Sequence, residues 1–489
     1  MTSTTKTRLW DALHAHAESS DPTPNKSPLF NAAACNIHVN YSNQHITPQT
    51  LALLHDLAES VELRQKIHGL MRGDTVNQSE KRPALHTALR ASGKTPIWLE
   101  QCDIMPEIMT ARYRMRAISE CIRSNQWMGF TGKPITDIVN IGIGGSDFGP
   151  RFCLSALAQY TSPHLRYHFI SDIDPDGFKQ AIKTLQPETT LFIIASKSFT
   201  TQETLYNAKK AIAWIGEQHT AKHFIAVTAQ ISKAHSLGIE TVLPIWDWIG
   251  GRYSLCSAIN LITAIAIGFD AFEALLSGAN SMDNHFHDTA FSHNLPVILA
   301  LLGIWNNNFL HRQNLLILTY SHYLEQFVPF IQQLDMESNG KCIDNQGVPV
   351  NHSTGPLIWG GLGNQAQHSY YQLLCQGTHR VAADFITMNT LNDEIINEMC
   401  AAKIRVLTTG VLAPENPVEH IYPNLPLNHI QIENNSPFTI GALIALYEHK
   451  VFVQSVIWNI NAFDQPGVES AKRFKAYDHI KQREAMYHD

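Results

Sequence analysis

The sequence comprises 489 residues, of which 44% are hydrophobic and 16% are charged, and its formal net charge is −7. This length and composition predict a globular protein of two or more domains and exclude a disordered or coiled-coil chain. The acidic balance argues against a broad nucleic-acid or anionic-membrane surface, because both partners require a basic face.

The eight cysteines and 25 histidines are dispersed, without a C-x-x-C pair or a His-Cys cluster at zinc spacing. Free thiols of this kind are typical of a reducing compartment. The N-terminus lacks the apolar core of a signal peptide, and the longest apolar stretches, at 255–269 and 297–305, are interrupted or too short to span a bilayer. We therefore expect a cytoplasmic protein with no membrane contact and no metal site.

Residues 1–100 mix helical patterns with Pro-rich and Asn-rich loops, so we expect a helical N-terminal segment that wraps the rest of the protein. Within it, residues 77–90 join a polar turn to a predicted helix. Ser79 is a plausible N-cap of that helix, because a hydroxyl can accept a hydrogen bond from the first turn.

The next part of the chain alternates short apolar runs with longer amphipathic ones, which predicts parallel sheets with helices on both faces. Strands are expected in a first region at 138–143, 167–170, 191–195 and 224–228, and in a second region at 315–320, 357–359 and 385–388. The predicted fold class is α/β with two mainly parallel sheets and helical terminal segments. Its expected ranges are 1–100, 101–290 and 291–450 for the wrapping segment and two α/β domains, and 451–489 for a C-terminal helical segment.

In open parallel sheets the ligand crevice lies beyond the carboxyl ends of the strands. The first strand is followed by the glycine-rich residues 141–149, where Gly145 and Ser146 could contact a sugar or its phosphate. A dinucleotide fingerprint would need glycine at Asp147, which weakens a nucleotide interpretation. A tight strand-to-helix turn is the alternative.

Residues 196–204, after the third strand, crowd hydroxyls, one ammonium and a helix start together. This combination suits a dianionic phosphate monoester, because the donors fix its oxygens while the lysine supplies positive potential. The stretch lacks the G-K-[ST] of a nucleotide P-loop, and a helix start rich in capping residues is the alternative.

Arg252 follows two glycines directly, so its guanidinium can be aimed into a crevice without a long loop. Arginine suits the stabilisation of an oxyanion because it stays charged at any working pH. A structural arginine that binds a carboxylate is the alternative.

Asp335 and Glu337 lie where an apolar run meets the turn sequence Ser-Asn-Gly, so a carboxylate there can be held rigidly and still meet a substrate. A solvated acidic turn is the alternative. His368 ends a polar loop whose glycines match a dinucleotide motif only formally, and a lone histidine is usually structural. Lys472 lies in a predicted helix that begins at a Pro-Gly break.

Taken together, these stretches resemble the phosphoglucose isomerase family over nearly the whole chain and in the same order. The patterns D-x-I-G-G-R-Y-S-L at 247–255 and F-D-Q-x-G-V-E-x-x-K at 463–472 are highly specific to it. The resemblance implies two sugar-isomerase (SIS) type α/β domains. It also implies reversible isomerisation of glucose 6-phosphate to fructose 6-phosphate through ring opening and a 1,2 proton transfer by way of an enediolate, in glycolysis and gluconeogenesis.

The resemblance also implies the roles of individual residues. Glu337 would be the base, Arg252 would stabilise the enediolate, and His368 and Lys472 would assist ring opening. A homodimer is implied, in which His368 of the partner subunit completes each site, and no metal or organic cofactor is used. The phosphate would be bound by Ser196, Lys197, Ser198 and Thr201, and the sugar site would be lined by Gly145, Ser146, Gln333 and Gln465.

This sequence departs from the family pattern at three positions: Ser198 replaces a threonine, Leu334 a glycine and Pro466 a tryptophan. Three alternative functions remain open at this point. They are an isomerase that also accepts mannose 6-phosphate, a non-catalytic sugar-phosphate sensor, and a dinucleotide-dependent oxidoreductase. The sensor is disfavoured because the base and its helpers are all present, and the oxidoreductase rests only on the glycine matches.

Overall fold

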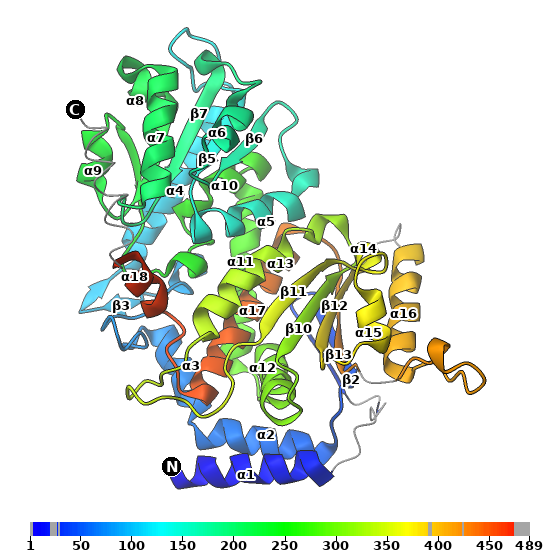
Figure 1. Cartoon of the computed structure of the whole chain (residues 1–489). Helices are drawn as coiled ribbons and strands as arrows, with labels where there is room; N and C mark the ends of the chain where they lie inside the picture. The colour runs from blue at the N-terminus through cyan, green and yellow to red at the C-terminus, as the bar shows by residue number, and fades with distance from the viewer. Residues whose placement is uncertain (1–2, 20–26, 28–29, 390–393, 423–424, 474–489) are drawn as a thin grey trace.

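Two large sheets organise the chain, and the computed structural model describes residues 3–19, 27, 30–389, 394–422 and 425–473. The first sheet has the strand order β6-β5-β7-β8-β9, and the second has the order β1-β2-β13-β12-β10-β11. Figure 1 shows them in separate parts of the molecule, each flanked by helices, with α11 and α17 lying between them. The predicted α/β fold class is confirmed.

The first sheet is entirely parallel, because a helical crossover separates each pair of consecutive strands up to β9. All residues of the three central strands, β5, β7 and β8, are buried, which explains why these strands are mainly apolar. The four predicted strands are confirmed, and the short edge strand β9 was not predicted. The strands are β5 (Asp137–Ile141), β6 (Arg166–Ile170), β7 (Thr190–Ala195), β8 (Phe224–Thr228) and β9 (Thr241–Pro244).

The second sheet joins four parallel strands to two antiparallel ones from the N-terminal segment. The predicted helical wrapping segment therefore also supplies strands, because Ile37, Val39 and Tyr41 alternate with polar residues and place one face of β2 in the core. The three strands predicted in this region are confirmed, while β1, β2 and β13 were not predicted. The strands are β1 (Asn31–Ala34), β2 (Ile37–Asn43), β10 (Asn314–Thr319), β11 (Leu357–Leu362), β12 (Ala382–Met388) and β13 (Leu427–Ile432).

Helices cover both sheets and fill the space between them. The helices that precede the first sheet in the chain are α1 (Ser3–Ser19), α2 (Pro48–Ser60), α3 (Leu63–Arg72) and α4 (Met105–Arg123), with the short pair β3 (Trp98–Leu99) and β4 (Cys102–Asp103) before α4. Those of the first sheet are α5 (Phe148–Ala156), α6 (Pro175–Ile182), α7 (Gln202–Ile215), α8 (Thr220–His223) and α9 (Ile231–Ser236). The remaining helices are α10 (Leu261–Ile267), α11 (Phe269–Asp288), α12 (Leu295–Ile304), α13 (Phe327–Ile331), α14 (Gly363–Ala366), α15 (Tyr371–Gln376), α16 (Glu394–Thr409), α17 (Pro437–Trp458) and α18 (Pro466–Arg473).

The predicted domain ranges stay a prediction, although two observations bear on where a boundary could fall. β2 pairs with β13, so part of the N-terminal segment belongs to the second sheet. Helix α17 runs through residue 450 without interruption, whereas the predicted break at 463–467 separates α17 from α18.

Ser79 does not cap a helix, contrary to the prediction. Residues Asn77 and Arg82 form an isolated bridge, and the only regular turn nearby is the 3-10 helix η1 (Ala88–Arg90). The Ser79 hydroxyl instead donates to Oδ2 of Asp464 at 2.5 Å. A distant carboxylate therefore satisfies the hydroxyl that local sequence assigned to a helix start.

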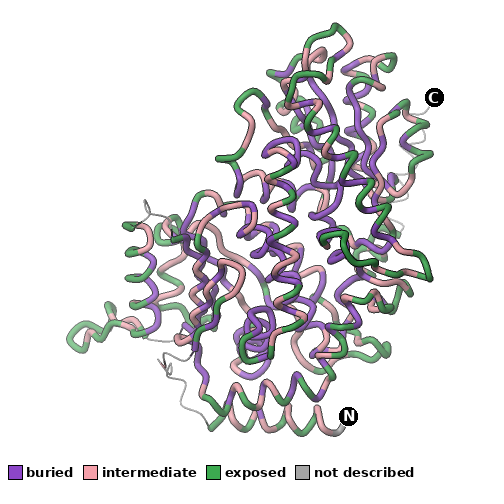
Figure 2. Tube along the Cα trace, turned by 180° about the vertical axis from the view of Figure 1, so that it is seen from behind, coloured by how far each residue is buried: buried purple, intermediate pink, exposed green. Residues whose placement is uncertain are grey.

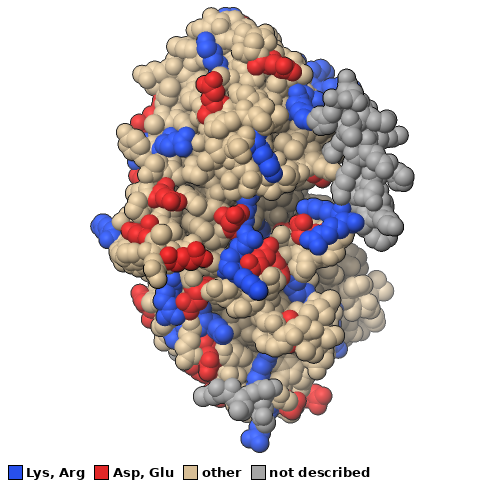
Figure 3. All heavy atoms as spheres, turned by 90° about the vertical axis from the view of Figure 1, so that its left-hand side faces the viewer, with Lys and Arg blue, Asp and Glu red and all other residues tan. Residues whose placement is uncertain are grey.

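Helix α17 is the central element of the core. By length and composition it is apolar enough to cross a membrane, but 94% of its most apolar window is buried inside the protein. Figure 2 shows buried residues along the strands of both sheets and along the central helices. On the face drawn in Figure 3, the Lys and Arg residues that the structure describes are interspersed with Asp and Glu residues and form no broad basic area.

Four consecutive polar residues of α17, Tyr447 to Lys450, are buried, and we call them the α17 polar tetrad. Consecutive residues on a helix point about 100° apart, so the four side chains leave the helix in four directions. Each meets a different element. The hydrogen bonds or ion pairs join Tyr447 to Asp384 of β12, Glu448 to Arg90 of η1, His449 to Asp283 of α11, and Lys450 to Asp335 beside the predicted base.

Candidate active site

The segment that carries Glu337 is a π-helix. Helix α13 continues into η10 (Gln332–Glu337), a π-helical stretch of the kind that is frequent at functional sites. Side chains two residues apart on a helix point to nearly opposite sides. Asp335 accordingly is fully buried, whereas the Glu337 side chain is 25% exposed. The predicted acidic pair is thus divided, and only Glu337 is placed to meet a substrate.

Arg252 reaches the same place from the first half of the chain. It lies on the short helix η6 (Gly251–Tyr253), and its Nη1 is 3.4 Å from Oε2 of Glu337. Gln333, one turn before Glu337, donates from Nε2 to that same oxygen at 3.1 Å. The guanidinium, the carboxylate and the amide therefore meet at one point, although some 80 residues separate Arg252 from the other two.

Most of the guanidinium donors are already used by the protein. Nε donates to the Ser338 hydroxyl at 2.7 Å, and Nη2 donates to the carbonyls of Ala462 and Asp464. Nη1 donates to Oε1 of Gln465 at 3.1 Å. Four of the five N–H groups are thus hydrogen-bonded, and the remaining one is on Nη1, the nitrogen that lies near Glu337. A developing oxyanion beside Glu337 would find its donor there.

Two glycine loops touch through their backbones. A Cβ placed on Gly145 would lie 2.0 Å from the carbonyl oxygen of Gly251, so any side chain at 145 would force the loops apart. Gly144 has a φ of +60° and faces Nε2 of Gln333, where a Cβ would lie 3.0 Å away. The loop that holds Gly145 and Ser146 is therefore packed directly against the Arg252 and Gln333 segments, as its predicted role requires.

The predicted phosphate loop is tied to the Arg252 segment by Lys197. Its ammonium donates to the carbonyls of Asp247 and Ile249, both at 2.9 Å, and the Asp247 carboxylate oxygen is 3.9 Å away. Burial lowers the pKa of Lys197. One N–H remains beyond the two carbonyl contacts and is available to an anion.

Hydroxyls surround the same loop at the start of α7. Ser196 lies 3.4 Å from the Thr201 hydroxyl, and Ser198 accepts a hydrogen bond from the Thr200 hydroxyl at 2.8 Å. The first backbone N–H groups of α7 follow directly, with Thr201 at the N-cap position. Hydroxyls, an ammonium and a helix N-terminus together favour a phosphate. Ser198, one of the departures from the family pattern, keeps the hydroxyl.

Lys341 is a residue of the site to which sequence reasoning gave no role. Its ammonium donates to the carbonyls of Ser338, Asn461 and Asp464 at 2.8–2.9 Å and lies 3.1 Å from Oδ1 of Asp464. It therefore ties the Glu337 segment to the loop between α17 and α18 (459–465), here called the C-terminal loop, which also binds Arg252. The feature of the sequence that could have indicated a role for Lys341 is its position directly after the turn sequence Ser-Asn-Gly.

The other two departures from the family pattern have structural roles. Leu334 is fully buried and packs in the core beneath the π-helix, and Pro466 begins α18. Proline is favoured at the first position of a helix, because its missing N–H would be unpaired there in any case. Both substitutions therefore fit the local structure around the site.

The structure does not bring His368 and Lys472 to Glu337. His368 is exposed in the turn that follows α14, and Lys472 is exposed on α18 with its ammonium 3.4 Å from Glu469. Neither residue contacts Glu337 or Arg252 among the described residues. Their predicted roles stay predictions.

Both glycine-rich stretches contain a residue with a structural contact. The carboxylate of Asp147 is occupied by Nε of Arg151, at 2.7 and 2.8 Å. In the second stretch a Cβ on Gly363 would lie 2.4 Å from the Tyr320 ring, so this glycine serves packing. Among the described residues, no group of three or more His, Cys, Asp and Glu side chains is placed to hold a metal ion.

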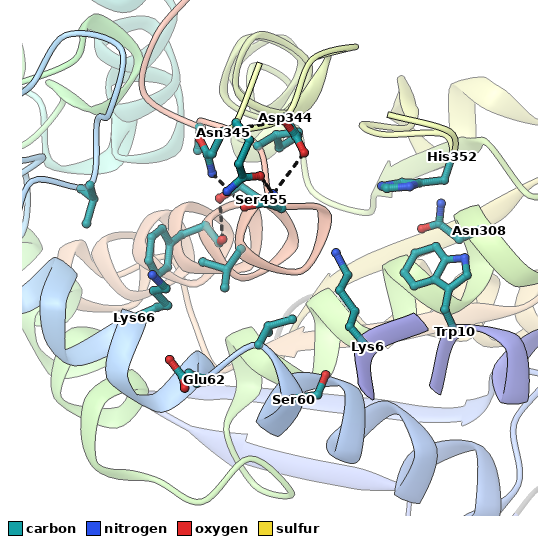
Figure 4. Close-up of a pocket in the computed structure, with 18 of the residues that line it drawn as sticks. Lys6, Trp10, Ser60, Glu62, Lys66, Asn308, Asp344, Asn345, His352 and Ser455 are labelled. Atoms are coloured by element: carbon teal, nitrogen blue, oxygen red, sulfur yellow. Dashed lines mark hydrogen bonds between the residues drawn. The ribbon is translucent and has the colours of Figure 1, made fainter. Parts of the chain in front are cut away.

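A cavity of about 1480 Å³ lies on the other side of the C-terminal loop. Figure 4 shows its walls, with Lys6 pointing into it from α1 and with His352 and Trp10 at one side. Its lining includes Ala462 and Phe463 but none of the predicted site residues. The cavity and the Glu337 site are therefore separate.

The sequence model of the family described as phosphoglucose isomerase matches residues 40–486. The chain belongs to the phosphoglucose isomerase family. A protein of Legionella pneumophila (strain Lens), named glucose-6-phosphate isomerase, is 55% identical over 96% of this chain and 97% of its own length. A protein of the same name from Shewanella baltica (strain OS185) is 42% identical over 96% and 94%. The crystal structure of a glucose-6-phosphate isomerase from Chlamydia trachomatis D/UW-3/Cx has a TM-score of 0.88 at 29% identity, covering 98% of this chain and 96% of that one.

Membership of the phosphoglucose isomerase family thus holds over nearly the whole length of the chain. The family match includes every stretch from Asn77 to Lys472 on which the resemblance was argued. The recognition made from these motifs is confirmed.

We expect Lys341 to give the site an alkaline limit. Burial and the neighbouring Arg252 lower the pKa of Lys341 to about 8. Its three N–H groups bind the carbonyls of Ser338, Asn461 and Asp464, and a neutral amine keeps only two N–H groups, so one of these three contacts is lost as pH rises through about 8. We expect kcat/KM, measured from pH 6 to 10, to fall with an apparent pKa near 8, and this limb to be missing from the lower profile of Lys341→Met.

Stability should respond to this group in the opposite direction. The folded pKa lies below the ordinary value of 10.5, so between these two pH values the unfolded chain holds the proton more often. This group alone therefore makes stability rise with pH in that window. The control for the kcat/KM profile is Lys179→Met, since that lysine is exposed beside Asp176. A wild-type kcat/KM profile that stays flat to pH 9.5 would contradict the assignment of the alkaline limit to Lys341.

Proposed function

We propose that this chain interconverts glucose 6-phosphate and fructose 6-phosphate, the reaction for which its close relatives are named. The observation that carries the proposal is the meeting of Glu337, Arg252 and Gln333, with Nη1 of the arginine 3.4 Å from the carboxylate. An aldose and a ketose interconvert when one base takes a proton from C2 and returns it to C1. A single partly exposed carboxylate beside a fixed cation suits that task.

Glu337 is the base in this proposal. It removes the C2 proton of the open-chain aldose, and the C2–H electron pair forms the C1–C2 double bond of an enediolate as the carbonyl oxygen becomes negative. The protonated carboxyl then returns the proton to C1, the hydroxyl proton on O2 passes to the negative oxygen on C1, and the ketone forms at C2. Gln333 holds the carboxylate in place through the hydrogen bond of 3.1 Å.

Arg252 stabilises the enediolate oxygen. Its free N–H is on Nη1, and the Nη1 partner Gln465 is a side chain that can turn away when substrate enters. The other contacts, to Ser338 and to two backbone carbonyls, keep the guanidinium in place while Nη1 acts. A preorganised donor of this kind stabilises charge without reorganisation during the reaction.

The phosphate is bound by Ser196, Lys197, Ser198 and Thr201, and Gly145, Ser146, Gln333 and Gln465 line the sugar site. Lys197 is hydrogen-bonded to the segment that ends in Arg252. The same stretch of chain therefore positions the phosphate group and the reacting carbons relative to each other. Binding energy from the phosphate, remote from the reaction, then holds C2 against Glu337.

Ring opening is assigned to Lys472 and to His368 of the partner subunit, in a homodimer located in the cytoplasm. Helix α18 begins directly after Gln465, which touches Arg252, so Lys472 lies on an element that starts at the site. The exposed position of His368 supports its use across an interface rather than within its own chain.

The test of the reaction is to incubate the protein with fructose 6-phosphate in deuterated water. We expect glucose 6-phosphate that carries deuterium at C2, because the proton on Glu337 can exchange with solvent before it is returned. Absence of glucose 6-phosphate would refute the substrate assignment. Product without deuterium at C2, together with recovered substrate without deuterium at C1, would instead indicate a hydride shift and remove Glu337 from its role.

Complementation between subunits tests the shared site. We expect Glu337→Gln and His368→Ala homodimers to be nearly inactive, and co-expressed mixed dimers to regain activity. In the mixed dimer, one site combines an intact Glu337 with an intact His368 supplied by the other chain. The measurement is the specific activity of purified mixed dimers, with a mixture of separately folded homodimers as control. Mixed dimers as inactive as their parents would show that His368 acts within its own subunit or not at all.

A further inference from the structure

Two residues before Glu337, the buried carboxylate of Asp335 is paired with Lys450 of the α17 polar tetrad, with Nζ 3.1 Å from Oδ2. We infer that Asp335 and Lys450 are positioning residues that hold the π-helix so that Glu337 stands at the reacting carbons. The inference rests on the proposed role of Glu337 as base.

Neither member of the pair can reach the substrate. The Asp335 side chain is fully buried and that of Lys450 is 2% exposed, so both act from behind the π-helix. A second contact supports the first, because Asn339 donates from Nδ2 to the carbonyl of Val451 at 3.3 Å and lies 3.5 Å from Oδ1 of Asp335. The segment that carries Glu337 is thus attached to α17 at two successive residues of that helix, Lys450 and Val451.

Lys450 is itself a fixed point. Tyr447 and Glu448, earlier in the tetrad, bind Asp384 at 2.9 Å and Arg90 at 2.5 Å. These contacts hold α17 against the second sheet and the N-terminal segment. The backbone of Lys450 is therefore held in place, and the burial of its side chain restricts where the ammonium can go.

The position of Asp335 is transmitted to Glu337 through the helix that they share. The two side chains leave η10 on nearly opposite sides, so rotation of the π-helix would move the Glu337 carboxylate as much as the Asp335 carboxylate. On the exposed side, the contacts of Glu337 with described residues are those with Gln333 and Arg252. Proton transfer requires reacting atoms about 3–3.5 Å apart, and a displacement of about 1 Å can cost about 10²-fold in rate.

The test uses Asp335→Asn/Lys450→Met, which removes both charges, because loss of one partner alone leaves a buried unpaired charge and destabilises the fold. Asp335→Asn alone is the conservative variant: it leaves the Lys450 charge unpaired and should lower Tm, but it keeps the shape and an acceptor for Lys450 and should therefore retain more of kcat than the double variant. In the double variant we expect kcat to fall about 10²-fold with KM nearly unchanged. The kinetic isotope effect with glucose 6-phosphate deuterated at C2 should rise, because a displaced base makes proton transfer the slow step.

The matched control is Asp137→Asn, which changes a buried carboxylate of the first sheet that pairs with Arg166 and does not contact α17 or the segment that carries Glu337. It should lower Tm and leave the isotope effect and KM at the wild-type values. A loss of activity in the Asp335 and Lys450 variants that only follows the unfolded fraction, with an unchanged isotope effect, would overturn the inference. That result together with an inactive Glu337→Gln leaves the proposed function intact, whereas an active Glu337→Gln would overturn the proposed function itself.

Discussion

Replacement of Glu337 by glutamine is expected to lower kcat by about 10²–10⁴-fold, the usual range for loss of a positioned base. The amide has the same shape and keeps an oxygen for the hydrogen bond from Gln333, but it cannot take a proton at neutral pH. Arg252 keeps its contacts to Ser338, Gln465 and the two carbonyls, so the fold and substrate binding should persist.

The rates should be measured from glucose 6-phosphate and from fructose 6-phosphate. Because one base serves both directions and an enzyme does not change the equilibrium, kcat/KM should fall by the same factor in each. Glu325→Gln is the matched control, since that glutamate precedes α13 and its neighbour is His322. Near-normal turnover in Glu337→Gln would show that another group moves the proton.

The second large effect is expected at Arg252. In Arg252→Ala we expect kcat to fall by about 10²–10³-fold, the scale for loss of one oxyanion donor, with a smaller change in KM. The substitution also removes one hydrogen bond each from the Ser338 hydroxyl and from the Ala462 and Asp464 carbonyls, although Lys341 still donates to the Asp464 carbonyl. Tm should therefore fall as well, because buried acceptors without donors are costly.

Arg252→Lys separates these two effects. A lysine keeps the positive charge but has three donors at one point, so it cannot serve Ser338, the loop carbonyls and the oxyanion together. We expect intermediate values of both kcat and Tm, and wild-type kcat in the control Arg116→Ala, whose guanidinium pairs with Glu120, Asp270 and Glu273. A rise in KM at constant kcat would make Arg252 a residue that binds the ground state instead.

Much of the fold could be predicted because the central strands are buried on both faces. Strands β5, β7 and β8 are short, mainly apolar runs in the sequence, and each was placed within one or two residues. Strands β2 and β13 were missed, although Ile37, Val39 and Tyr41 show the alternation of a half-buried strand. Their pairing joins opposite ends of the chain, and a local pattern does not indicate its partner.

The candidate site was predictable where a motif fixes the chemistry. Arg252, Lys197 and Glu337 lie in stretches whose residue types suggest a cation, an anion site and a base, and the structure connects them through Gly251, Gln333 and the Asp247 carbonyl. The supports behind them were not predicted. The α17 polar tetrad lies within a helix that reads as plain core, and its partners come from four distant elements.

The pairing of β2 with β13 also sets an order of events during synthesis. Ile37 pairs with Ile432, and a ribosome that adds about 5–20 residues per second needs on the order of 20–80 s to travel between them. Through that interval the edge of the nascent β2 that pairs with β13 has no partner strand, and Arg90 cannot yet form its ion pair with Glu448. A chain truncated before β13 therefore lacks both the strand that pairs with β2 and the glutamate that pairs with Arg90.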